Sequence, residues 1–316
     1  MSQEIVVASQ LGLALDAQIS RQLPHVRVVS VPMYFDSLPL EARVLIAAFN
    51  PSTAAGEARL RPKGWPFGLE WVQLVSAGID AYPDWLFEVP LMSTARGTSA
   101  HPVAEWAIAA LFAAAKDIPS LWVSNAEQWT RRPLATLHGS TLGIVGFGAI
   151  GQALAQKAIG LGMRVKALRR STQPFAVAGV ERAADIVELF ANCDHVVLAA
   201  PATAETHHLV NAELLAQAKP GLHLVNVARG SIVDQNALLA ALDNGRLGFA
   251  SLDVTDPEPL PTGHPLYSHP RVRISPHTAA ISAFTQQALV DKFVRNLAAF
   301  QAGEPIDDTV EKKPVR

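Results

Sequence analysis

The sequence predicts an α/β protein built on doubly wound parallel sheets, with one larger and one smaller domain. Two series of short apolar runs alternate with longer segments of helical period, and the runs are apolar almost throughout rather than at every second position. Nearly continuous apolar strands separated by helices are typical of parallel sheets that are buried on both faces. With 316 residues, the chain is long enough for two domains with their own cores.

The first series predicts four strands followed by a helix. The expected strands are Ile5–Ala8, Val26–Val31, Val44–Phe49 and Trp71–Val75. Between Ser99 and Lys116 apolar residues recur at helical spacing, which predicts a long amphipathic helix. A loop rich in tryptophan, arginine and proline then separates the two series.

The second series predicts the larger sheet. Its expected strands are Leu142–Phe147, Arg164–Leu168, His195–Ala199, Leu222–Val227, Phe249–Asp253 and Val272–Ser275, and its helices include Ile150–Leu161, Ala183–Phe190 and Gln235–Asn244. A last apolar helix, about Ala279–Gln301, is expected to pack back on the first series. We therefore predict a discontinuous domain, residues 1–100 with 282–316, and a second domain of residues 101–281.

Composition and net charge exclude some classes of function. The chain is 49% hydrophobic and 17% charged, and its net charge of −2 gives no global basic field for nucleic acid or an anionic membrane. Cys193 is the sole cysteine and cannot form an internal disulfide, and the N-terminus does not resemble a signal peptide. We expect a cytoplasmic protein without a membrane span. We expect no metal either, because the adjacent His207 and His208 lack metal-ligand spacing.

A glycine pattern opens the second series. It reads Gly146-Phe147-Gly148-Ala149-Ile150-Gly151, between an expected strand and an expected helix. Gly146 permits the tight turn, Gly148 allows a pyrophosphate to approach the backbone, and Gly151 lets the helix pack on the strand. The alternative is an ordinary glycine turn. The strand before it and the helix after it favour a Rossmann-type dinucleotide site.

The following strand ends in Arg169-Arg170-Ser171-Thr172. Arg169 lies 18 residues past Gly151, about where NAD-binding chains carry an acidic residue for the ribose hydroxyls. An arginine cannot accept those hydrogen bonds, but Arg169 and Arg170, with help from the hydroxyl of Ser171 or Thr172, can bind a 2′-phosphate. A solvated basic turn is the alternative. The pattern favours NADP(H) over NAD(H).

Three later segments carry the candidate catalytic groups. Arg229 offers a planar cation for a carboxylate beside a carbonyl, although a surface ion pair is the usual fate of an arginine. His277 follows an expected strand and can exchange a proton with the carbonyl, and Glu258 would raise its pKa and orient its ring. Asp253 ends another expected strand, where it can accept a bond from a cofactor amide or simply shape a loop.

Together, these motifs resemble the D-isomer-specific 2-hydroxyacid dehydrogenases, most strongly over about Val103–Ala280. The matching segments are Val103-Ala104-Glu105, Gly146–Gly151, Pro201–Thr206, Asn226–Gly230 with Val233-Asp234, Asp253-Val254 through Glu258-Pro259, and Pro276–Ala279. The resemblance implies that Arg229, Glu258 and His277 are catalytic. It also implies that a loop in the smaller, flavodoxin-like domain, Ala77-Gly78-Ile79, lends backbone N–H groups to the substrate carboxylate.

The resemblance further implies a cofactor site and an activity. Residues expected to line the cofactor, besides the three glycines and the arginine segment, are Ala149, Ile150, Pro201, Thr206, Val227, Ala228 and Asp253. Among relatives, the chain is most similar to NADPH-dependent glyoxylate/hydroxypyruvate reductases, which implies reduction of a small 2-keto acid to the D-2-hydroxy acid. NAD stays an alternative cofactor, and a homodimer through the loop around Trp122 and Trp129 fits the family.

Two questions stay open at this point. A cofactor-sensing binding protein on the same fold, as in certain transcriptional corepressors, is an alternative function. The aromatic residues Phe67, Trp71, Tyr82 and Trp85 either edge the substrate cleft or fill the smaller core.

Overall fold

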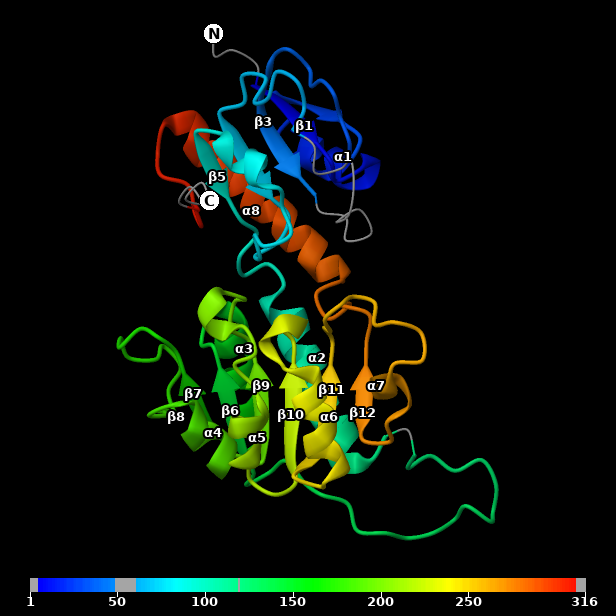
Figure 1. The fold of residues 1–316 in the computed structure, drawn as a ribbon. Helices are drawn as coiled ribbons and strands as arrows, with labels where there is room; N and C mark the ends of the chain where they lie inside the picture. Colours follow the sequence, from blue (N-terminus) through cyan, green and yellow to red (C-terminus); the bar gives the residue numbers. More distant parts are fainter. Residues whose placement is uncertain (1–4, 49–60, 119, 311–316) are drawn as a thin grey trace. The chain divides into compact units, whose positions relative to one another are not determined.

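The computed structural model describes residues 5–48, 61–118 and 120–310 (Figure 1). The chain forms two compact units, Met1–Thr98 with Ser282–Arg316, and Ser99–Ile281. The first unit thus combines both ends of the chain, whereas the second is one continuous stretch. Each unit is built on one sheet.

The second unit contains a seven-stranded parallel sheet in the order β12-β11-β10-β9-β6-β7-β8. Its strands are β6 (Thr141–Val145), β7 (Arg164–Leu168), β8 (Val180–Arg182), β9 (His195–Leu198), β10 (Leu222–Asn226), β11 (Leu247–Leu252) and β12 (Val272–Ile274). From β6 the chain adds β7 and β8 toward one edge of the sheet, and β9 then pairs with β6 on the side opposite β7. Such a switch point opens a crevice at the carboxyl ends of the strands, where ligands of doubly wound sheets bind.

Helices cover both faces of this sheet (Figure 1). They are α2 (Ala100–Lys116), α3 (Ala149–Gly160), α4 (Ile186–Asn192), α5 (Ala212–Ala216), α6 (Gln235–Asp243) and α7 (Pro265–Ser268). Successive residues of β9 point to opposite faces, so Val196 and Leu198 join one buried cluster with α4, α5 and α6. Val197 joins a second cluster with α2 and α3. Burial on both faces explains why these strands are apolar throughout.

The first unit contains a five-stranded parallel sheet in the order β2-β1-β3-β4-β5. Its strands are β1 (Ile5–Ser9), β2 (Val26–Ser30), β3 (Ala42–Ala47), β4 (Trp71–Leu74) and β5 (Leu91–Ser93), and its helices are α1 (Leu13–Gln22), the 3-10 helix η3 (Asp84–Glu88) and α8 (Ala283–Ala302). This is the order of flavodoxin-like sheets. The predicted fold class, a doubly wound parallel sheet with a smaller α/β domain, is confirmed.

The C-terminal helix α8 packs on the N-terminal sheet, as its apolar pattern predicted. Phe293 stacks on Trp71 of β4 with ring centroids 5.4 Å apart. Buried Asn296 donates a hydrogen bond to Gln73 of the same strand at 3.2 Å. The helix begins at Ala283 rather than at Ala279, because Ser282 caps it by accepting a bond from the Thr285 N–H.

Several other boundaries differ from the prediction. The two edge strands β5 and β8 were not predicted, since three residues carry too little pattern. The helix expected from Ala183 begins at Ile186, because the Asp185 carboxylate caps the Glu188 N–H. The third strand ends at Ala47, and Phe49 lies outside the described residues.

Of the four aromatic residues whose role the sequence did not decide, two fill the core of the first unit. Trp71 is fully buried and donates a hydrogen bond to Ser93 at 2.9 Å. Tyr82 is buried as well, and burial raises its pKa to about 12. Phe67 and Trp85 are only partly buried, and both lie against Trp65. Of the four, these two retain surface that a ligand can reach.

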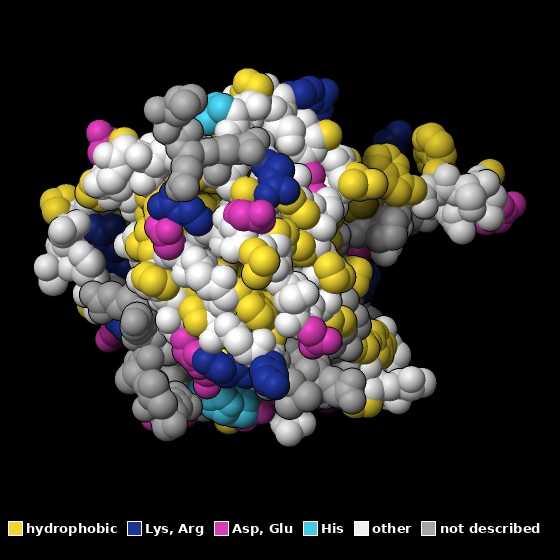
Figure 2. Space-filling model, turned by 90° about the horizontal axis from the view of Figure 1, so that it is seen from above, with side chains coloured by type: hydrophobic (Ala, Val, Ile, Leu, Met, Phe, Trp, Pro, Cys, Tyr) yellow, Lys and Arg dark blue, Asp and Glu magenta, His cyan; other side chains and the backbone are white. Residues whose placement is uncertain are grey.

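Charges of both signs are mixed on the face of the molecule drawn in Figure 2, where dark-blue and magenta side chains lie side by side. Ion pairs in the first unit have the same character. They are Arg27–Glu41, Arg43–Glu70 and Arg61–Glu88, with N···O distances of 3.3, 2.5 and 2.7 Å. On these surfaces charge is balanced locally rather than gathered into one sign.

Candidate active site

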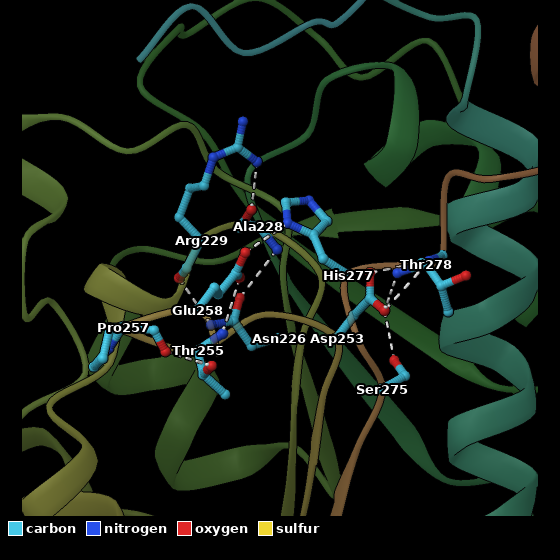
Figure 3. Close-up of polar contacts among 11 residues, drawn as sticks. Asn226, Ala228, Arg229, Asp253, Thr255, Pro257, Glu258, Ser275, His277 and Thr278 are labelled. Carbon is cyan, nitrogen blue, oxygen red and sulfur yellow. Dashed lines mark hydrogen bonds and ion pairs between the residues drawn. The ribbon is translucent and has the colours of Figure 1, made fainter. Parts of the chain in front are cut away.

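Three neighbouring strands of the larger sheet bring the candidate catalytic side chains together (Figure 3). Arg229 follows β10, Glu258 lies in the loop after β11, and His277 follows β12. These strands are adjacent and parallel, so their carboxyl ends meet at one edge of the sheet. Residues that are distant in sequence therefore share one site.

His277 and Glu258 form a hydrogen-bonded ion pair. The His277 Nδ1 lies 2.9 Å from the Glu258 Oε2. The other carboxylate oxygen, Oε1, accepts a bond from the Thr255 N–H at 3.1 Å. The glutamate is thus held from both sides, and the Nε2 of His277 is the nitrogen left to meet a substrate.

The pairing shifts the pKa of each side chain in the direction that favours its charged form. The hydrogen bond that His277 donates to Glu258, assisted by the negative charge of Glu258, raises the pKa of His277, although burial and the charge of Arg229 act against this. Burial acts to raise the pKa of Glu258, but the bonds from His277 and the Thr255 N–H and the charge of Arg229 outweigh it and lower the pKa. The imidazolium form of His277 therefore persists to higher pH than in a free histidine.

A network centred on Asp253 fixes the loop that carries His277. The buried Asp253 carboxylate accepts bonds from the Ser275 hydroxyl and from the backbone N–H groups of Thr278 and Ala279. The His277 N–H donates to the Asp253 carbonyl at 2.8 Å, and His277 has a φ of 50°. A non-glycine residue held at positive φ is often found at a functional site. The bonds that Asp253 makes here hold this loop, and its contact with a cofactor amide stays a prediction.

Arg229 sits on a turn that the buried Asn226 closes. The Asn226 side chain accepts a bond from the Ala228 N–H and donates one to the Arg229 carbonyl, at 3.0 and 2.9 Å. The Arg229 Nη1 donates to the Ala228 carbonyl at 2.8 Å. A Cβ on Gly230 would lie 1.9 Å from the backbone of Thr255, so only glycine lets the arginine turn pack on the loop of Glu258. Asn226 and Thr255 are positioning residues to which the sequence interpretation gave no role.

The glycine loop fits a dinucleotide. Gly146 has a φ of 96°, and a Cβ there would lie 2.6 Å from the Ala200 nitrogen. A Cβ on Gly151 would lie 2.5 Å from the Gly146 carbonyl oxygen, so both glycines are required for close packing. By contrast, a Cβ on Gly148 would meet nothing within 4 Å, and the N-terminus of α3 has no side-chain cap. Open space at an uncapped helix N-terminus suits a pyrophosphate.

Other predicted cofactor residues lie around the same edge. Ala149 and Ile150 form the first turn of α3, and Val227 and Ala228 follow β10. Pro201 and Thr206 lie in the loop after β9, where the Thr206 hydroxyl donates to the Pro201 carbonyl at 2.8 Å. The Thr206 side chain thus shapes this loop, and contacts of all six residues with a cofactor stay predictions.

The arginine segment follows β7, beside the glycine loop in the sheet order. Arg169 donates through Nη2 to the carbonyls of Gln173 and Pro174, at 2.6 and 3.0 Å, and its buried Nε has no hydrogen-bond partner among the described residues. Arg170 and Ser171 are exposed. Arg169 is therefore engaged in shaping the loop, while its neighbours present their side chains to solvent.

The predicted carboxylate loop, Ala77-Gly78-Ile79, follows β4 in the first unit. The Ser76 hydroxyl donates to the Gly78 carbonyl at 2.6 Å, which turns the chain here. The loop lies at the carboxyl end of a parallel strand, as do the residues of the larger sheet. Its role in holding a substrate stays a prediction.

Two further properties concern the described residues as a whole. No group of three or more His, Cys, Asp or Glu side chains among them is arranged to hold a metal ion. None of the helices that the structure describes has the length and apolar content that a bilayer span needs.

The chain is similar to known proteins of one enzyme family. Residues 108–279 match the family model described as "D-isomer specific 2-hydroxyacid dehydrogenase, NAD binding domain". Glyoxylate/hydroxypyruvate reductase A of Serratia proteamaculans is 34% identical over 248 residues, 75% of this chain and 78% of that protein. Glyoxylate reductase of Thermococcus gammatolerans is 36% identical over 203 residues, 61% of this chain and 60% of that reductase.

A solved structure resembles the whole chain. It is a D-isomer specific 2-hydroxyacid dehydrogenase from Xanthobacter autotrophicus Py2, crystallised in complex with NADPH and MES. The two chains superpose with a TM-score of 0.81 at 27% identity, over 98% of each. Since the family model covers more than half of the 316 residues, the chain belongs to the D-isomer-specific 2-hydroxyacid dehydrogenases, a family of oxidoreductase enzymes.

Proposed function

We propose that this protein transfers a hydride from NADPH to a small 2-keto acid such as glyoxylate or hydroxypyruvate, giving the D-2-hydroxy acid. The observation that carries the proposal is the pairing of His277 with Glu258 at 2.9 Å. The pair lies at the carboxyl ends of the strands, and Arg229 lies at the same edge of the sheet. A fixed cation beside a proton donor is what a carbonyl next to a carboxylate requires.

The bound nicotinamide supplies the hydride. The Arg229 guanidinium binds the substrate carboxylate and polarises the carbonyl through its planar pair of N–H groups. The imidazolium of His277 donates its Nε2 proton to the carbonyl oxygen as negative charge develops there, and Glu258 keeps the ring protonated and oriented through Nδ1. In the reverse direction, neutral His277 takes the proton back. The N–H groups of Ala77, Gly78 and Ile79 hold the carboxylate in this proposal.

Substrate size and cofactor choice form the finer part of the proposal. The Serratia and Thermococcus relatives are named as reductases of glyoxylate, or of glyoxylate and hydroxypyruvate, which supports a short 2-keto acid. Three observations support NADPH over NADH. Position 169 holds an arginine instead of an acidic residue, Arg170 and Ser171 are exposed, and the Xanthobacter structure contains NADPH.

The assembly and compartment are also proposed. Trp122 and Trp129 are 70% and 75% exposed in the loop between α2 and β6, the blue-green to green segment that extends away from the sheet in Figure 1. Such aromatic exposure supports a homodimer through this loop. Cys193 is buried, and burial raises the pKa of its thiol to about 11, which agrees with a structural thiol in a reducing cytoplasm.

The test is a panel of acceptors. Purified protein with NADPH or NADH is offered glyoxylate, hydroxypyruvate and pyruvate, and cofactor oxidation is followed by absorbance. Oxidation of NADPH with glyoxylate or hydroxypyruvate, and formation of D-glycerate from the latter, are expected. Cofactor binding without turnover of any acceptor would favour the corepressor-like alternative. If the protein reduces another carbonyl compound but none of these three acids, the proposed substrate class is wrong.

A further inference from the structure

The segment after β7 is folded around one aromatic ring. The ring of Phe175 lies under two guanidinium groups, with the Cζ of Arg169 at 5.2 Å and the Cζ of Arg182 at 4.5 Å from its centroid. Arg182 comes from the edge strand β8, which the sequence pattern did not reveal. The same ring therefore gathers one cation from the turn after β7 and one from β8.

Both arginines also bond to the backbone of this segment. Arg182 donates through Nη1 to the Ser171 carbonyl at 3.1 Å and through Nη2 to the Gln173 carbonyl at 2.6 Å. Arg169 donates to the Gln173 carbonyl as well. These bonds fix the turn from the end of β7 to Phe175. Residues 170–174 of this turn are exposed, and the side chains among them that can donate hydrogen bonds to a phosphate include Arg170, Ser171 and Thr172.

Phe175 also connects this turn to the glycine loop. Its ring lies 4.4 Å from the ring of Phe147, centroid to centroid. Phe147 is 3% exposed and stands between Gly146 and Gly148. The aromatic pair therefore joins the loop that suits the pyrophosphate to the turn that suits the adenosine ribose.

We propose that Phe175 and Arg182 are positioning residues that set the preference for a 2′-phosphate. They hold the turn so that Arg170 and the hydroxyls of Ser171 and Thr172 present their donors to the phosphate without first being ordered. Donors fixed before binding avoid an entropic cost that flexible ones incur. This inference rests on the proposed use of NADPH and names residues that the glycine and arginine motifs do not include.

The test measures binding without turnover. Isothermal titration compares adenosine 2′,5′-bisphosphate with 5′-AMP, which differ only by the 2′-phosphate. The variants are Arg182→Met, Phe175→Leu and Phe175→Tyr. The matched control is Arg273→Met, because Arg273 also lies over a phenylalanine ring, at 5.3 Å from the Phe249 centroid, and donates to the carbonyls of Pro270 and Val272.

Wild type is expected to bind the bisphosphate at least about 10-fold more tightly than 5′-AMP, since one charge-assisted bond contributes about that much. Arg182→Met and Phe175→Leu are expected to reduce this ratio by about 3-fold to 10-fold, as loss of a cation–π contact and of ordered donors predicts. Phe175→Tyr, which keeps the ring, and Arg273→Met should leave the ratio unchanged. A variant that only destabilises the fold would weaken both ligands alike.

Two contrary results are distinguishable. If wild type binds the bisphosphate no better than 5′-AMP, the proposed use of NADPH fails and the inference fails with it. If wild type discriminates but Arg182→Met and Phe175→Leu discriminate equally well, the use of NADPH stands and the positioning role is wrong.

Discussion

Replacing Glu258 with glutamine should move the alkaline decline of keto-acid reduction to lower pH. Reduction requires the imidazolium form of His277, which is present below its pKa and lost as pH rises through it. Glu258 raises that pKa by accepting the Nδ1 hydrogen bond at 2.9 Å and by its negative charge. Glutamine keeps the shape and a hydrogen bond but removes the charge, so the acid form is lost at lower pH.

The size of the shift follows from the geometry. A hydrogen bond to a charged group contributes about 1.5–3 kcal/mol, which corresponds to a change of about 10-fold to 100-fold in the fraction of protonated His277 at alkaline pH. The side chains of His277 and Glu258 are 44% and 33% exposed, so solvent screens the pair. The lower end is therefore expected, a kcat/KM for Glu258→Gln about 10-fold below wild type at a pH above the wild-type decline.

The assay is kcat/KM for glyoxylate as a function of pH, with hydride transfer shown to be rate-limiting by a deuterated cofactor. Glu70→Gln is the matched control, because Glu70 pairs with Arg43 at 2.5 Å with similar exposure but lies in the other unit. Its profile should coincide with that of wild type. A Glu258→Gln profile that declines at the wild-type pH would refute the proposed coupling of the two side chains.

Three further predictions concern the substrate, the cofactor and the core. Arg229→Lys should lower kcat/KM by about 100-fold with cofactor affinity preserved, because lysine loses the planar two-point contact, and kinetics with cofactor titration check this. Arg170→Ala should weaken NADPH by about 10-fold to 100-fold and leave NADH unchanged, which titration of both cofactors measures. The pKa of His223 is lowered to about 3, chiefly by burial. The contribution of this neutral side chain to the free energy of unfolding should therefore be fully present above about pH 6.5, and the free energy should fall by up to about 1.4 kcal/mol per pH unit below that. Urea unfolding at several pH values tests this, and His223→Gln should reduce the slope; an equal slope would contradict the assignment.

The sequence was sufficient for the fold class and the family. Strands such as β9, with Val196 and Val197 buried on opposite faces, have an apolar pattern that indicates a parallel sheet directly. The order of Arg229, Glu258 and His277 at the ends of successive strands also placed these side chains at one edge before any geometry was known. Short-range pattern and parallel topology together made this prediction possible.

Contacts between loops could not be predicted in the same way. That Gly230 packs on the backbone of Thr255 depends on two loops that meet only in the folded chain. The assignment of Arg169 as a phosphate ligand missed its bonds to carbonyls four and five residues ahead, because backbone acceptors leave no trace in side-chain identity. The bonds by which Asp253 holds the His277 loop likewise require the loop conformation.

The most direct test of the proposed chemistry is single-turnover reduction of glyoxylate by the NADPH complex of wild type and of His277→Asn. Asparagine retains a polar side chain but cannot donate a proton as an imidazolium does. Wild type should oxidise its bound NADPH, and His277→Asn should do so about 100-fold to 10,000-fold more slowly, the range that general acid catalysis spans, with NADPH affinity unchanged. Hydride transfer at the wild-type rate in His277→Asn would contradict the assignment of His277 as the proton donor.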